Sequence, residues 1–241
     1  MQLTFTSIAD RSVSLVGLNV FHAIDLAEKC FMLKLNGRKS DMTSRDFVTH
    51  LAKIMGVERT ELVSVDRALS KAGLRQVARG RFRPDITLLE GLQIALAWAG
   101  VQNLTMADQE VERLRKFHAQ EGDYLESVGI EEPPQQPEFL ELYGCSRTKL
   151  AGRNFFDVVA TATQSIGQGK YPAREYFAHI QKGGAVELTH QSGPMQTRRL
   201  SFADLGRKLE IGKPRKAPPV TVTVAISGEV LKWIYAETEA A

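Results

Sequence analysis

Arginine, lysine and small hydroxyl side chains are concentrated between residues 59 and 83 of this 241-residue chain. Guanidinium and ammonium groups bind phosphate oxygens, and arginine, serine and threonine side chains also bond to the edges of bases. From Arg38 to Arg83 the chain has eleven lysines and arginines against five aspartates and glutamates, a net charge of +6, whereas the whole chain carries +3. The positive charge is therefore local, and it favours a polyanionic partner. The candidate binding residues are Arg59, Thr60, Ser64, Arg67, Lys71, Arg75, Arg79, Arg81 and Arg83.

Two predicted helices and a turn must position these side chains. The first helix starts at a capping pair, Thr43 with Asp46, and ends at Gly56, a residue that tolerates the left-handed backbone of a turn. The second helix is predicted over 59–72, and its polar residues point outward. The apolar residues that recur at helical spacing and define the two inner faces are Leu51, Ala52, Met55, Val57, Leu62, Val65 and Leu69.

This pattern resembles the helix-turn-helix and winged-helix DNA-binding proteins, over residues 43–84. The small Ala52 lets the second helix approach, and Gly56 makes the turn four residues later. The arginines interleaved with Gly80 and Phe82 resemble a wing or a basic arm. The resemblance implies a recognition helix at about 59–72 in the major groove and a basic loop at 75–83 on the backbone or in the minor groove. Bases would be read by Arg59, Thr60, Ser64 and Arg67, and phosphates or the minor groove would be held by Lys71, Arg75, Arg79, Arg81 and Arg83.

A second interpretation stays open. An Ala-x-x-x-Gly pattern also occurs in helices that only pack together, and arginines beyond a helix C-terminus complement its dipole without any ligand. On this reading the chain is a protein–protein interaction factor of phage or plasmid type, such as a host-interaction protein or a DNA-packaging adaptor. Its basic helical surface would then bind an acidic partner.

No motif typical of an enzyme or a metal site occurs in the sequence. It contains no GxxxxGKS, GxGxxG, HExxH or GxSxG pattern, so we predict no catalytic residue, no cofactor and no metal. The two cysteines, Cys30 and Cys145, lie in unrelated segments, which favours a reducing compartment. The most apolar stretch, 15–35, includes four charged residues and predicts an amphipathic helix instead of a membrane span. We therefore expect a cytoplasmic protein.

Changes in composition predict two domains. Residues 1–120 are expected to form a mainly α domain that contains the helix-turn-helix with its basic wing-like loop and a later helix from Thr87 to Gly100, opened by a capping box with Glu90. The stretch 121–141 has three prolines and no lysine or arginine, as is typical of an acidic linker. Residues 142–241 predict a small α+β domain for dimerisation, effector or partner binding. Its predicted elements are a helix at 154–166, a hairpin at 185–202 with a Gly193-Pro194 turn, a strand at 220–226 and a last helix after Ser227.

Together these observations predict a sequence-specific double-stranded DNA-binding protein, a transcriptional regulator, without enzymatic activity. One helix contacts too few base pairs for useful specificity, so we expect a homodimer that binds two half-sites about one helical turn apart. The C-terminal domain would be the part that can bind a protein partner.

Overall fold

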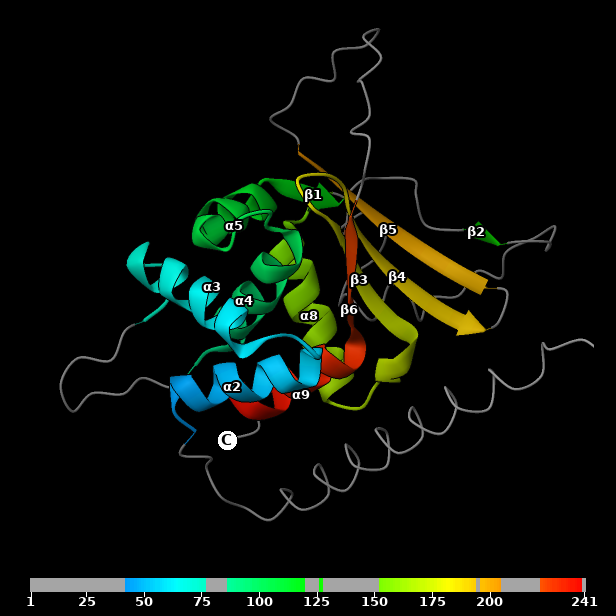
Figure 1. The fold of residues 1–241 in the computed structure, drawn as a ribbon. Helices are drawn as coiled ribbons and strands as arrows, with labels where there is room; N and C mark the ends of the chain where they lie inside the picture. The colour runs from blue at the N-terminus through cyan, green and yellow to red at the C-terminus, as the bar shows by residue number, and fades with distance from the viewer. Residues whose placement is uncertain are drawn as a thin grey trace, which may run out of the picture. The chain divides into compact units, whose positions relative to one another are not determined.

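The computed structural model in Figure 1 describes residues 42–76, 86–119, 126–127, 152–193, 196–204 and 222–239. All of these residues belong to one compact unit, 41–241. The predictions for the helix at 15–35, for Arg79, Arg81 and Arg83, and for nearly all of the acidic stretch 121–141 lie outside the described residues.

Two helices open the described chain where the sequence predicts them. α2 (Ser44–Met55) starts at Thr43, whose hydroxyl accepts from the Asp46 N–H at 3.2 Å and donates to the Asp46 carboxylate at 2.6 Å. It ends at Gly56, whose φ of 67° is a left-handed value that glycine adopts without strain. α3 (Arg59–Lys71) follows directly after the turn. The predicted helices and the turn between them are thus confirmed as secondary structure.

α4 (Leu88–Gly100) lies at the centre of the helices. It begins with the predicted capping box, in which the Thr87 hydroxyl accepts from the Glu90 N–H and the Glu90 carboxylate accepts from the Thr87 N–H. Eleven of its thirteen residues are buried. A helix that is apolar on all sides must be covered on all sides. A short helix, η1 (Leu104–Met106), and then α5 (Ala107–Arg115) come after it.

In the described ranges, six strands form one antiparallel sheet. They are β1 (Phe117–Ala119), β2 (Glu126–Ser127), β3 (Tyr176–Gln181), β4 (Val186–Gly193), β5 (Gln196–Asp204) and β6 (Thr223–Ser227). Their order is β1-β5-β4-β3-β6, and β2 also pairs with β5. β4 and β5 form the predicted hairpin, with Leu188 opposite Leu200. β6 confirms the strand predicted at 220–226, whereas its neighbour β3 was not predicted.

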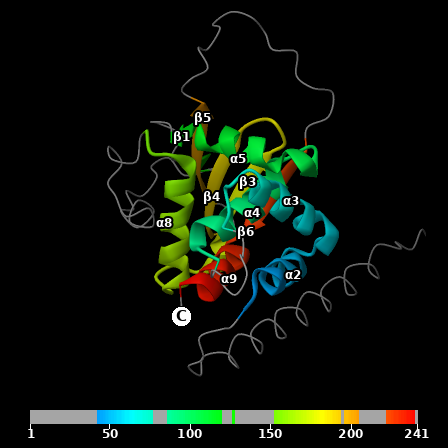
Figure 2. The same cartoon turned by 90° about the vertical axis from the view of Figure 1, so that its left-hand side faces the viewer.

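The helices cover one face of this sheet. Besides α4 and α5, these are α8 (Phe155–Gly167), the short η2 (Ala173–Glu175) and α9 (Gly228–Thr238). α4 and α8 lie to the left of the strands in Figure 1 and on the viewer's side of them in Figure 2, with α9 below and α5 above. Along β3 the buried and half-buried residues alternate. The inward side chains from the other strands that join this core include Val186, Leu188, Leu200, Phe202 and Ile226.

The prediction of separate domains at 1–120 and 142–241 is wrong for the part of the chain that the structure describes. The Phe47 ring on α2 lies 5.1 Å, centroid to centroid, from the Trp233 ring on α9. At Gly91 on α4 an added Cβ would be 2.9 Å from Ile234 Cγ2 of α9. The buried residues of all the helices and of the sheet form a single cluster. Eleven of the thirteen residues of α4 are buried, and α2 and α3 need the later helices and the sheet to cover them.

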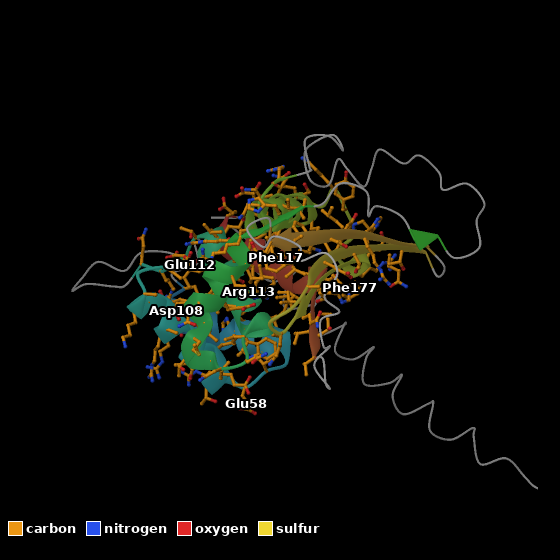
Figure 3. All side chains as sticks on the ribbon, turned by 90° about the horizontal axis from the view of Figure 1, so that it is seen from above. Glu58, Asp108, Glu112, Arg113, Phe117 and Phe177 are labelled. Atoms are coloured by element: carbon orange, nitrogen blue, oxygen red, sulfur yellow. The ribbon has the colours of Figure 1, made fainter. Side chains whose placement is uncertain are left out.

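A polar contact joins α5 to the sheet as well. Arg113 forms two bonds with Glu110, of 2.8 and 2.7 Å, and donates to the Gly184 carbonyl in the turn before β4 at 2.7 Å. Its guanidinium carbon lies 5.0 Å from the centre of the Phe117 ring on β1 (Figure 3). One side chain thus contacts α5, β1 and the β3–β4 turn.

We expect the Gly91→Ala variant to lose about 1–3 kcal/mol of unfolding free energy, because the new methyl group would press on Ile234 and Phe47. At an unobstructed helical site the same change stabilises, by about 0.5–1 kcal/mol. The sign of the change in unfolding free energy therefore shows whether the site is closely packed, and urea denaturation measures this change. A stabilised Gly91→Ala variant would contradict the close packing of α4 against α9.

The two tryptophans report on the two halves of the chain, since Trp98 is on α4 and Trp233 is on α9. The variants Trp233→Phe and Trp98→Phe each keep one tryptophan. For each variant we measure urea unfolding by tryptophan fluorescence and by far-ultraviolet circular dichroism. We expect the two signals to give the same urea midpoint, as one cooperative unit requires. Two separated transitions would instead indicate two domains.

Candidate nucleic-acid interface

α3 has one buried face and one exposed face. Leu62, Val65 and Leu69 are fully buried, with 0% of each side chain exposed. On the other side Arg59, Thr60, Arg67 and Lys71 are exposed, and Ser64 is half-buried. We call these five residues the α3 rim. They are the five predicted DNA-binding residues that belong to the helix, and the structure brings them together on one element.

The spacing of the α3 rim places four of its five members in a row. Thr60, Ser64, Arg67 and Lys71 follow one another in steps of four, three and four residues, which keeps them on the same side of a helix. One member of this row already forms a bond within the helix, because the Ser64 hydroxyl donates to the Thr60 carbonyl at 2.8 Å. The Ser64 oxygen can therefore accept a hydrogen bond from a ligand, but its proton is already used within the helix.

The α3 rim carries three cations, Arg59, Arg67 and Lys71. Within the described ranges, none of Arg59, Arg67 and Lys71 forms an ion pair with a carboxylate. The carboxylate of Glu61, on the same helix, accepts a bond of 2.8 Å from the indole Nε1 of Trp98 on α4. Glu61 thereby fixes α3 against α4.

Arg75 does not belong to this surface, although the sequence places it among the phosphate-binding residues. It is 8% exposed and pairs with Asp66 of α3. Burial lowers the pKa of its guanidinium, and the Glu90 carboxylate acts in the opposite direction. A guanidinium that is enclosed and paired in this way cannot reach a phosphate without leaving the protein interior. The sequence does not reveal this, because an arginine just beyond a helix is usually solvated.

Glu90 of α4 forms a long-range bond that the sequence analysis missed. It is 8% exposed. Its Oε1 accepts from the Gln76 N–H at 2.7 Å, and its Oε2 accepts from the Thr87 N–H at 2.9 Å and from the Thr87 hydroxyl at 3.0 Å. The capping-box pattern predicted the bonds to Thr87. The bond to Gln76 spans fourteen residues, and no local pattern could have predicted it.

Other surfaces offer less chemistry. An open groove of about 430 Å³ runs beside α5 and is lined by Asp108, Gln109, Glu112, Arg113, Lys116 and Asp204. Figure 3 shows Asp108, Glu112 and Arg113 along this helix. Charges of both signs line the groove, and Arg113 is already bonded to Glu110 and Gly184.

Among the residues that the structure describes, no group of three or more His, Cys, Asp or Glu side chains is placed to hold a metal ion. None of the described helices is long and apolar enough to cross a membrane.

Comparison with known proteins adds no relative. No protein-family model, curated protein or solved structure matches this chain. The function must therefore be argued from the α3 rim and from the contacts that hold it.

We expect the Asp66→Ala variant to lose about 2 kcal/mol of unfolding free energy, because it leaves the buried Arg75 charge without its partner. The loss should shrink in the double variant Asp66→Ala with Arg75→Met, where no charge remains. Glu112→Ala is the matched control, since it removes one carboxylate from an exposed pair with Arg115. That variant should lose about 0.5 kcal/mol or less. Equal losses in the two single variants would show that the Asp66–Arg75 pair is not shielded from solvent.

Proposed function

We propose that this protein binds double-stranded DNA in a sequence-specific manner and acts as a transcriptional regulator. The observation that carries the proposal is the α3 rim: a row of cationic and hydroxyl side chains on one exposed face of a helix whose opposite face is fully buried. A helix about 10–12 Å across enters the major groove of DNA, which is about 12 Å wide. In that position Arg59, Thr60, Ser64 and Arg67 would contact base edges, and Lys71 would contact a phosphate.

The contacts that hold the inner face of α3 favour a rigid recognition helix for a DNA groove. Apolar packing holds its inner face, and the Glu61–Trp98 bond fixes it to α4. A binding surface on a rigid element loses little conformational entropy when the ligand binds. Because a single helix contacts few base pairs, we further propose a homodimer that binds two half-sites about ten base pairs apart.

A salt titration with duplex DNA tests the proposal. The natural probe is a fragment that carries the gene's own upstream region, with a random-sequence duplex of equal length as competitor. The observed affinity should fall steeply as salt rises, because each phosphate contact releases a counterion. Equal affinity for both duplexes would remove the claim of sequence specificity, and no binding at low salt would remove the proposal.

The Arg67→Ala and Lys71→Ala double variant should weaken binding by about tenfold or more, since a base contact by arginine is worth about 1–3 kcal/mol. Lys170→Ala with Arg174→Ala is the matched control, because it removes the same charge from two exposed cations outside α3. The control should bind within about twofold of the wild type. Equal weakening by the two double variants would mean that only net charge matters and that α3 does not enter a groove.

A further inference from the structure

We infer that Trp98 is a positioning residue for DNA binding: its indole holds the carboxylate of Glu61 against α4, away from DNA at the α3 rim. The inference rests on the proposed function and deepens it, because it states how an anionic side chain beside the rim is kept from repelling phosphates. It concerns only α3 and α4, and the structure describes every residue of these two helices.

Glu61 lies at the border of the α3 rim. It is in the first turn of α3, directly after Thr60 and three residues before Ser64, which are both rim residues. On a helix, side chains three positions apart are neighbours. Glu61 is half-buried, whereas Thr60 is exposed. A carboxylate at this border can turn either toward α4 or toward the rim.

The Glu61 carboxylate turns toward α4. Its Oε2 accepts a hydrogen bond of 2.8 Å from the indole Nε1 of Trp98. An indole N–H only donates and a carboxylate only accepts, so each satisfies the other. Trp98 is one of the two residues of α4 that are not fully buried, and its ring reaches α3 from the helix that lies behind it.

α3 itself supplies no cation that could hold Glu61. Ion pairs within a helix form between residues three or four positions apart. At these distances from Glu61 the sequence has Val57, Glu58, Ser64 and Val65. None of the four is a lysine or an arginine. The side chain that fixes this charge therefore comes from α4.

Release of the carboxylate would place a negative charge beside bound phosphates. Like charges a few ångströms apart at a protein surface repel each other, and salt screens this repulsion only over about 8–10 Å. When it is bonded to Trp98, the carboxylate is held on the side of α3 that faces α4, farther from DNA at the rim. Loss of the indole should therefore weaken DNA binding through the charge of Glu61, although Trp98 does not contact DNA.

The experiment measures affinity for the upstream duplex at low salt. Trp98→Phe removes the indole N–H and keeps an aromatic ring, and we expect about three- to tenfold weaker binding. Adding Glu61→Gln removes the charge, so this double variant should bind within about twofold of the wild type although it lacks the same indole. Alone, Glu61→Gln keeps an acceptor oxygen for Trp98 and should change affinity by less than about twofold.

A second pair of variants leaves Trp98 intact. Aspartate and asparagine have the same size and differ in charge, and both are one methylene too short to reach the indole. Glu61→Asp should therefore weaken binding about as much as Trp98→Phe, whereas Glu61→Asn should bind within about twofold of the wild type. If the bond only supported the shape of α3, the two variants would weaken binding equally. This pair also decides the matter if Trp98→Phe does not fold.

Two further variants are matched controls. Trp233→Phe removes an indole from α9, where the ring packs on Phe47 of α2, and should leave DNA affinity within about twofold. Glu58→Gln removes an exposed carboxylate just before α3. Its effect on affinity should be the same in the wild type and in the Trp98→Phe variant, because its charge does not depend on Trp98.

The inference is overturned if Trp98→Phe folds and binds DNA as well as the wild type. It is also overturned if Glu61→Gln does not restore binding to Trp98→Phe, or if Glu61→Asp and Glu61→Asn weaken binding equally. In each of these cases the wild type still binds and the proposed function stands. A wild type that binds no duplex removes both.

Discussion

The burial of α4 is the constraint on which the rest of the structure depends. Its sequence, LLEGLQIALAWAG, is apolar almost all the way round, and eleven of its thirteen residues are buried. α2, α3 and α5 cover part of this helix, and α8, α9 and the sheet cover the remainder. None of these groups would suffice by itself, because each leaves apolar surface of α4 in water. The single core follows from that requirement.

Local features of the sequence predicted local features of the fold. The caps at Thr43 and Thr87, the left-handed Gly56, the hairpin and the last strand are all set by short stretches of chain, and the structure has them in place. The sheet itself extends further than the sequence indicates. β3 was missed because Ala178 and His179 blur the apolar alternation that marked β6, and β1 and β2 are too short to produce a pattern.

The errors concern contacts between distant segments. The domain division followed the change in composition at 121–141, but Phe47 packs on Trp233 across that stretch. The all-round apolar character of α4 was the available sign that a lone helical domain could not bury it. Arg75 was assigned to the surface because its sequence neighbours are basic. Its partner, Asp66, lies on α3, the helix that precedes it, and the sequence does not indicate this pairing. For the candidate interface, the exposure of Arg59, Arg67 and Lys71 followed from helical spacing, whereas the bond between Glu90 and Gln76 could be seen only in three dimensions.

The contact between α2 and α9 has a consequence for the genetics of this protein. α9 is the last described element of the chain, and its Trp233 and Ile234 complete the packing around Phe47 of α2 and Gly91 of α4. A stop codon or frameshift before residue 228 would remove α9 and expose that packing. We therefore expect late truncations to behave as complete loss-of-function alleles, without a surviving N-terminal fragment that could compete with the intact protein.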